Sequence, residues 1–140
     1  MLHGPLTHPP LLAALAAAGH GSRVLIADGN YPHSTGVNPS AERVFLNLRP
    51  GLATVDDVLD VLVRAVPLES ATVMVPPEGQ TVPAHDGFRE ILGDLEWNEV
   101  GRFEFYDLCK TPDVAVVVAT GEQRVYANVL LTIGVRTPEQ

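Results

Sequence analysis

Two short stretches near opposite ends of the chain carry side chains that could do chemistry. Gly19-His20-Gly21 precedes an apolar run at residues 24–27, and Asp28 follows that run directly. Histidine titrates near neutral pH and can take up and release a proton. A carboxylate can accept hydrogen bonds from two hydroxyl groups or orient a partner. The first stretch therefore offers a proton carrier, His20, and a ligand-binding carboxylate, Asp28.

The second stretch covers residues 119–131 and has the pattern of a strand, a turn and a strand. Tyr126 and Asn128 are two residues apart, so in an extended chain their side chains project from the same face. An amide both donates and accepts hydrogen bonds, and a phenol can donate or stack. Presented together, these two groups suit a hydroxylated ligand.

An α/β sheet is the element that must position these groups. The apolar run at residues 24–27 is bounded by glycines, as in strands buried on both faces of a sheet. Asp28 then lies at the carboxyl end of a strand, where ligand sites of open α/β sheets gather. Pro9 and Pro10 suit a first helical turn and Gly19 a carboxyl cap, which predicts a helix at 10–18. Hydrophobic spacing predicts further helices from Thr54 to before Pro67 and from 84 to about 97.

Thr54 is expected to begin the second helix, with Asp57 returning a capping contact. Extended patterns predict strands at 24–27, 43–48, 71–75, 113–120 and 124–133. Residues 102–108 are expected to open as extended chain and then form a short helix. The last two strands are predicted to pair antiparallel, because only residues 121–123 join them. The predicted fold class is α/β, a single-domain mixed and mostly parallel sheet flanked by helices.

Length and composition limit the class of protein. The 140 residues fit one domain, and 46% hydrophobic with 19% charged residues exclude a disordered chain. A net charge of −8 argues against nucleic acid or an anionic membrane surface as partner. The single Cys109 cannot form an internal disulfide, and no cysteine and histidine cluster has zinc spacing. This cysteine usage favours a reducing, cytoplasmic setting. The apolar residues 11–18 lack the basic leader of a signal peptide and are interpreted as part of an amino-terminal helix.

Taken together, the motifs resemble the ribose pyranase and fucose mutarotase family along nearly the whole chain. The motifs are Gly19-His20-Gly21, Asp28 with Asn30 and Pro32, Arg102-Phe103-Glu104-Phe105-Tyr106, Thr120-Gly121-Glu122 and Tyr126-Ala127-Asn128. Their order and spacing carry the resemblance. It implies the RbsD-like fold and a cofactor-free, metal-free isomerase that interconverts the anomers of a monosaccharide.

The resemblance also implies roles for individual residues. His20 would act as the acid/base, together with Tyr126 as a second catalytic group. The positions that match sugar-binding residues of the family are Asp28, Arg102, Tyr126, Ala127 and Asn128. The Arg102 motif resembles the fucose mutarotase branch, whereas alanine at position 127 is usual in the ribose pyranase branch. The expected substrate is L-fucose or a similar sugar. D-ribose, or a non-catalytic sugar-binding or transport-associated module, is the alternative.

Spacing sets a condition on such a site. His20 and Asp28 are eight residues apart, and an extended chain rises roughly 3.3 Å per residue, so the two could stand more than roughly 20 Å apart. Either the chain bends sharply around Gly21 or Gly29, or one site takes His20 and Asp28 from different subunits. Members of the family assemble as rings, commonly decamers, and our hypothesis is the second arrangement, a homo-oligomer with sites at subunit interfaces.

Several of these side chains also have ordinary structural explanations. Asp28 could hold the following turn, Tyr126 could pack within a strand, and Arg102 could form a surface ion pair. Among the remaining polar or reactive side chains, His33 is expected to face solvent, with a role in covering the site as the alternative. Glu122 is expected to shape its turn, with a role in the chemistry as the alternative. Cys109 is expected to be a buried small apolar residue, and the role of Tyr106 stays open. Trp97 is expected to be a core residue, with a sugar-stacking platform as the alternative.

Overall fold

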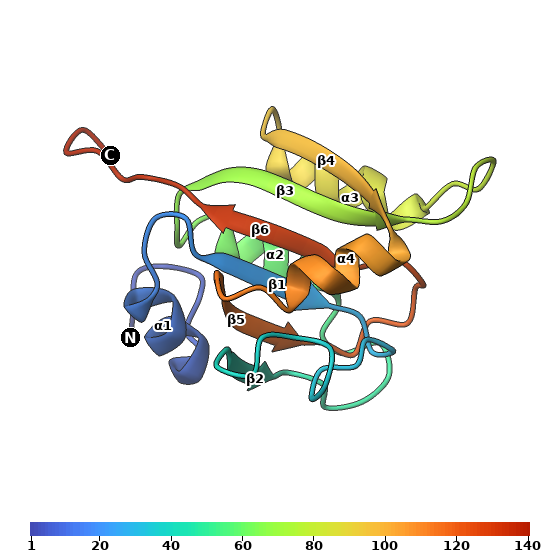
Figure 1. Ribbon diagram of the computed structural model, residues 1–140. Helices are drawn as coiled ribbons and strands as arrows, with labels where there is room; N and C mark the ends of the chain where they lie inside the picture. Colours follow the sequence, from blue (N-terminus) through green and yellow to red (C-terminus); the bar gives the residue numbers. More distant parts are fainter.

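One six-stranded sheet organises the molecule (Figure 1). The computed structural model describes residues 1–140. The strands lie in the order β2-β5-β1-β6-β3-β4. Their bounds are β1 Arg23–Ala27, β2 Glu42–Phe45, β3 Leu68–Val75, β4 Glu96–Gly101, β5 Val114–Ala119 and β6 Val129–Ile133. The helices are α1 Pro9–Ala17, α2 Val55–Leu62, α3 Pro83–Leu92 and α4 Arg102–Cys109.

The sheet is mixed and mostly parallel. The pairs β1–β5, β2–β5 and β3–β4 are parallel, whereas β6 runs antiparallel to both of its neighbours, β1 and β3. The predicted fold class is confirmed. None of the four helices is long and apolar enough to cross a membrane.

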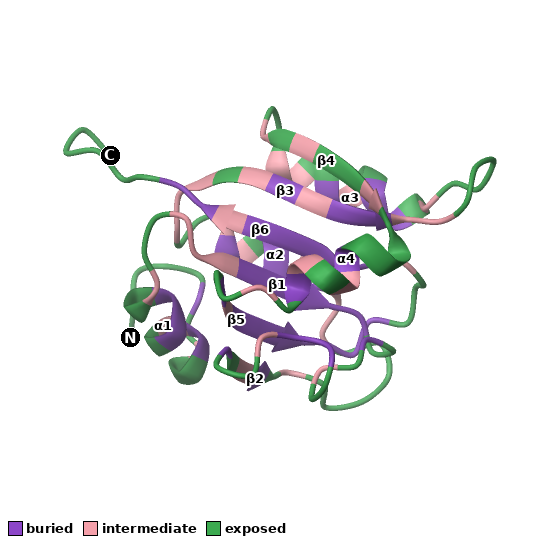
Figure 2. Ribbon diagram, viewed as in Figure 1, coloured by how far each residue is buried: buried purple, intermediate pink, exposed green.

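Alternating side chains of the central strands build a core on each face of the sheet. In β1, Val24 and Ile26 join one cluster and Leu25 and Ala27 the other. Helices α1, α2 and α3 cover the first face, and α4 covers the second together with chain segment 31–41 (Figures 1 and 2). The three strands β5, β1 and β6 are buried along most of their length, as Figure 2 shows. This burial on both faces explains their continuous apolar sequences.

Local signals in the sequence fix the beginnings of two helices. Helix α1 starts at a pair of prolines, whose fixed φ suits the first turn. Thr54 caps α2 as predicted: its side chain accepts from the Asp57 amide at 3.2 Å, and the Asp57 carboxylate accepts from the Thr54 amide at 2.9 Å.

The helix predicted for residues 84–97 is too long. Helix α3 ends at Leu92, Gly93 adopts φ +64°, and the chain continues into the edge strand β4. Leu95 continues the helical spacing of the preceding apolar residues only by coincidence. The helix ends earlier because Gly93 terminates it. Residues 102–108, predicted to open as extended chain, are helical from Arg102 onward.

The predicted pairing of the last two strands is wrong. Strand β1 lies between β5 and β6, so the two never meet. The prediction extended the last strand to Arg124, but β6 begins only at Val129 and a nine-residue connection follows β5. This connection crosses the end of β1, where Thr120 donates to the Ala27 carbonyl from its amide at 3.2 Å and from its hydroxyl at 2.7 Å.

Candidate functional site

The sheet brings chain segments from both ends of the sequence to one edge. The parallel strands β1 and β5 end at this edge, and β6 begins there because it runs antiparallel to β1. Asp28 directly follows β1 and Asn128 directly precedes β6. Two residues that are 100 positions apart are therefore neighbours.

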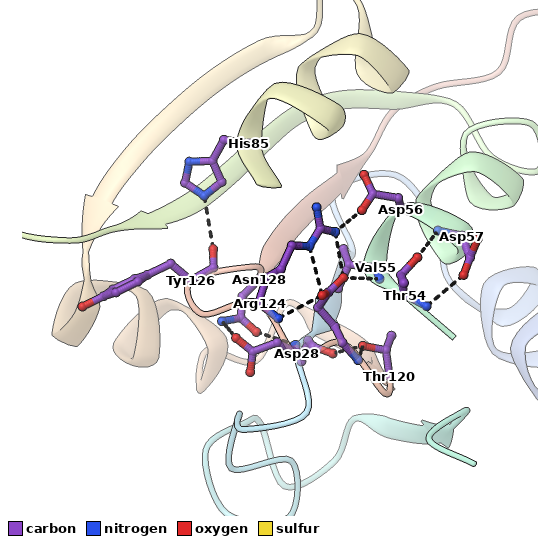
Figure 3. A network of polar contacts seen from close by, with 12 residues as sticks. Asp28, Thr54, Val55, Asp56, Asp57, His85, Thr120, Arg124, Tyr126 and Asn128 are labelled. Atoms are coloured by element: carbon purple, nitrogen blue, oxygen red, sulfur yellow. Dashed lines mark hydrogen bonds and ion pairs between the residues drawn. The ribbon is translucent and has the colours of Figure 1, made fainter. Parts of the chain in front are cut away.

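Asp28 and Asn128 form a reciprocal pair (Figure 3). The Asp28 amide donates to Oδ1 of Asn128 at 2.7 Å, and Nδ2 of Asn128 donates to Oδ2 of Asp28 at 3.0 Å. The other carboxylate oxygen accepts from the Asn30 amide at 2.9 Å. Both side chains are buried. Each carboxylate oxygen keeps a lone pair for a further donor.

Burial raises the pKa of Asp28, and the hydrogen bonds from Asn30 and Asn128 offset this effect only in part. A carboxylate that is short of solvent gains more from a hydroxyl donor than an exposed carboxylate does. Asp28 is therefore prepared to accept a hydrogen bond from a polar ligand.

A cavity of about 310 Å³ opens beside this pair. Its size is at the small end of the range of about 300–1,000 Å³ that is typical of small-molecule sites. Its lining residues are Asp28, Asn30, Tyr31, Met74, Arg102, Tyr106, Val125, Tyr126 and Asn128. Four of the predicted site residues, Asp28, Arg102, Tyr126 and Asn128, thus share one cavity.

Helix α4 contributes a cation and an aromatic ring. Arg102, its first residue, is exposed and makes no ion pair, so its guanidinium donors are available. It lies 5.7 Å from the Tyr106 ring centre. Tyr106 meets the buried Tyr31 edge to face at 5.5 Å, and the Tyr31 hydroxyl donates to the Gly36 carbonyl at 2.9 Å. Tyr106, whose role the sequence left open, therefore forms part of the cavity wall.

Tyr126 reaches the cavity from a turn and not from a strand. The prediction that it projects with Asn128 from one strand face is wrong, because Tyr126 has a left-handed backbone with φ +58° and lies before β6. Its side chain is half-buried. Ala127, also predicted to bind a ligand, buries its methyl group completely in the core, so it can serve a ligand only through its backbone.

The turn after β5 holds the site in place through Glu122. Its carboxylate is buried and accepts from the Val55 amide at 3.2 Å, from the Arg124 amide at 3.0 Å and from the Arg124 guanidinium. Arg124 also pairs with Asp56. Burial raises the pKa of Glu122, but these hydrogen bonds outweigh burial and hold it at about 2. The prediction that Glu122 shapes its turn is confirmed.

His20 lies away from this cavity. It precedes β1, whereas Asp28 follows it, and a five-residue strand rises about 16 Å. The sharp bend that would have brought them together does not occur. The His20 ring is exposed, and its Nε2 lies 3.2 Å from Oε2 of Glu69, at the start of β3. A carboxylate only accepts, so Nε2 carries the proton in this contact.

His33 differs from its prediction, whereas Cys109 and Trp97 match theirs. His33 was expected to face solvent, but it is half-buried and its Nε2–H donates to the Asp28 carbonyl at 2.9 Å. Cys109 is buried as expected, and burial raises the pKa of its thiol to about 11. Trp97 packs against the core, also as expected.

Sequence reasoning assigned no ligand contact to Tyr31, Met74 or Val125, which also line the cavity. Tyr31 and Met74 are typical core residues by type, and Val125 follows an apolar pattern, so their chemistry gave no signal. Asn30 was part of a motif without a role. Position was the usable signal for Tyr31 and Asn30, because both follow the end of a buried strand.

A larger hollow of about 490 Å³ also borders Asn30. Loop segments 47–50 and 120–123 line it together with Gly29 and Asn30. Its one carboxylate, Glu122, is already fully engaged with Val55 and Arg124. Of the two, only the smaller cavity offers a carboxylate that can still accept from a ligand. No cluster of three or more histidine, cysteine, aspartate or glutamate side chains is placed to hold a metal ion.

A buried carboxylate–amide pair, aromatic walls and one unpaired guanidinium line a cavity that suits a small hydroxylated molecule on an α/β scaffold. The chain belongs to the RbsD / FucU transport protein family, whose model matches residues 1–136. It is 34% identical to a fucose mutarotase of Danio rerio, over 94% of this chain and 91% of that protein. It is 35% identical to a D-ribose pyranase of Paracidovorax citrulli (strain AAC00-1), over 93% of this chain and 95% of that protein.

Two solved structures have the same fold. Bacillus subtilis RbsD complexed with D-ribose matches with a TM-score of 0.84 and 28% identity, over 98% of this chain and 99% of that one. The fucose mutarotase from Streptococcus pneumoniae in complex with L-fucose matches with a TM-score of 0.84 and 27% identity, over 98% of this chain and 100% of that one.

Proposed function

We propose that this protein is an isomerase that interconverts the anomers of a monosaccharide without a cofactor. The observation that carries the proposal is the single cavity shared by Asp28, Arg102, Tyr126 and Asn128 in a chain of the RbsD / FucU family. Relatives named as fucose mutarotase and D-ribose pyranase match it over more than nine-tenths of its length.

Mutarotation requires two proton transfers and no redox chemistry. One group takes the proton from the anomeric hydroxyl as the bond between the anomeric carbon and the ring oxygen breaks. A second group gives a proton to that ring oxygen, and the roles reverse when the ring closes on the other face. We assign these roles to His20 and Tyr126. Asp28 and Asn128 hold sugar hydroxyls, and Arg102 donates to a sugar oxygen.

The proposal requires a second copy of the chain, because His20 lies at the far end of β1 from Asp28. We propose that His20 of one subunit completes the cavity of another in a ring-shaped homo-oligomer, with a decamer as the expected form. Two exposed apolar side chains support an interface at the cavity mouth: Val125, which lines it, is 65% exposed, and Phe103, next to Arg102, is 75% exposed. Burying such residues against a second copy is favourable.

We propose L-fucose as the sugar that is preferred. The side chains of Arg102 and Tyr106, from the motif that resembles the fucose mutarotase branch, line the cavity. Ala127, the residue that is usual in the ribose pyranase branch, points its methyl group into the core and does not line it. The feature that resembles the fucose branch is therefore the one in reach of a sugar.

A non-catalytic sugar-binding module is the second candidate, because the cavity by itself contains no histidine. The two candidates differ in the effect of His20→Ala. A binding module keeps its affinity and has no rate to lose, whereas an isomerase loses rate with little change in affinity.

Saturation-transfer NMR on equilibrated L-fucose and D-ribose tests the proposal. Exchange between the anomeric signals is measured with the wild-type protein, with His20→Ala and without protein, and sugar affinity is measured in parallel. We expect faster exchange with the wild type, a larger effect on L-fucose, and loss of the acceleration in the variant. Binding without acceleration of either sugar would favour the module.

A further inference from the structure

The backbone of Tyr126 is held by a residue outside the cavity. Tyr126 has φ +58°, a conformation that costs a non-glycine residue of order 1 kcal/mol and therefore needs support from its surroundings. Its carbonyl oxygen accepts a hydrogen bond from the Nε2–H of His85 at 3.2 Å. In Figure 3 this carbonyl points toward the His85 ring, while the phenol extends in a different direction.

His85 is itself firmly placed. It lies in the first turn of α3, is 7% exposed, and packs its ring 5.7 Å from Trp97 and 5.9 Å from Phe88. Burial lowers the pKa of His85, which favours the neutral ring. A neutral imidazole has one N–H, and the carbonyl contact fixes that hydrogen on Nε2.

We propose that His85 is a positioning residue for Tyr126: its ring N–H holds the left-handed turn that directs the phenol into the cavity. This inference rests on the proposed function, because Tyr126 is assigned there as a group that acts on the sugar. His85 does not line the Asp28 cavity, so its effect on the reaction passes through Tyr126.

Two variants separate the hydrogen bond from packing. His85→Phe keeps a planar ring against Trp97 and Phe88 but has no N–H, and His85→Gln keeps an N–H donor on a side chain of similar reach. His3→Phe is the matched control, because His3 is exposed and lies outside the site. Both His85 variants are also made in a Tyr126→Phe background, which removes the phenol hydroxyl alone.

The first measurement is kcat/KM for anomer exchange with the preferred sugar. One hydrogen bond lost at the turn predicts about a tenfold decrease in His85→Phe and recovery to within about threefold of wild type in His85→Gln. In the Tyr126→Phe background, His85→Phe should change kcat/KM by less than about twofold, since the group through which it acts is gone. An equal loss in both backgrounds would overturn the proposal.

The second measurement does not depend on activity. Amide hydrogen exchange of residues 124–128 is compared in the sugar-free protein, and we expect about tenfold faster exchange in His85→Phe and near-wild-type exchange in His85→Gln. Unchanged exchange in His85→Phe would overturn the positioning role. If the wild type accelerates no anomer exchange, the proposed function fails on its own, and this measurement still decides whether His85 holds the Tyr126 turn.

Discussion

Asp28 and Asn128 are hydrogen-bonded to each other and still leave lone pairs free for a ligand. Each donates to the other, and each is buried, so neither can lose its partner without exposing an unsatisfied polar group to the interior. This mutual arrangement keeps the carboxylate oriented toward the cavity before any ligand arrives. A preorganised acceptor loses less entropy on binding than a mobile one.

Replacing Asn128 by Asp should separate structure from function at this pair. The variant puts two carboxylates in contact and removes the donor to Asp28, so we expect a loss of about 2–3 kcal/mol in the free energy of unfolding at pH 7. Urea unfolding at a fixed protein concentration measures it.

The exchanged double variant Asp28→Asn/Asn128→Asp is the control. Residue 128 can then accept from the residue 28 amide and side chain, so most of the stability should return. Sugar binding should remain weak, because the carboxylate has moved. A stable variant that binds sugar like the wild type would contradict the role of Asp28.

The motif order in the sequence predicted four of the cavity residues, Asp28, Arg102, Tyr126 and Asn128, but not how they are held. Tyr126 illustrates the reason. Nothing in its neighbours signals a left-handed backbone, since the support comes from His85 on another element. Tyr31 and Met74 were missed because aromatic and apolar side chains at a cavity wall have the same composition as a core.

Among the elements, the turn at residues 120–124 links the site to the scaffold. Thr120 ties it to the end of β1, Glu122 ties it to the first residue of α2, and Arg124 extends the network to Asp56. Strand and helix positions followed from hydrophobic patterns and caps. The pairing of β5 with β1 did not, because pairing depends on long-range contacts that local spacing does not encode.

Glu122→Gln should change the pH dependence of stability. The folded pKa of about 2 lies below the ordinary value of 4.5, so the carboxylate stabilises the fold fully above pH 4.5, and this contribution is lost as the pH falls toward 2. At pH 7 we expect the variant to lose about 2–3 kcal/mol. Unfolding midpoints from pH 7 to 2 should converge with those of the wild type. Glu104→Gln, at an exposed position, should follow the wild type throughout.

Gly121→Ala should disturb the same turn by steric overlap. A Cβ atom at this position would lie 2.4 Å from the backbone oxygens of Arg49 and Leu52, which cannot rotate away. We expect a loss of about 2–3 kcal/mol in thermal or urea unfolding. Gly134→Ala is the control, because its Cβ would meet only ordinary contacts at 3.4 Å or more. Equal stability of the two variants would refute the close approach at Gly121.

For the whole molecule, the geometry of the sheet determines what a single chain can do. All parallel strands end at the edge that carries the cavity. His20 and Glu69 lie at the amino-terminal ends of β1 and β3, on the side of the sheet away from the cavity. One chain therefore separates the proposed proton carrier from the proposed sugar site. The spacing of His20 and Asp28 indicated this separation from the sequence. A surface for the proposed second copy could not be predicted, because exposed apolar residues have no local pattern.

Mixing two inactive variants tests the central claim most directly. His20→Ala and Asp28→Asn each lack one half of the proposed site. If His20 and Asp28 come from different subunits, oligomers reassembled from equal amounts of the two variants contain about one quarter intact sites. We predict that anomer exchange on L-fucose, measured by saturation-transfer NMR, recovers to about one quarter of the wild-type rate in mixed oligomers and stays absent in each variant alone. Mixed oligomers without activity, from a wild type that is active, would contradict a site shared between subunits.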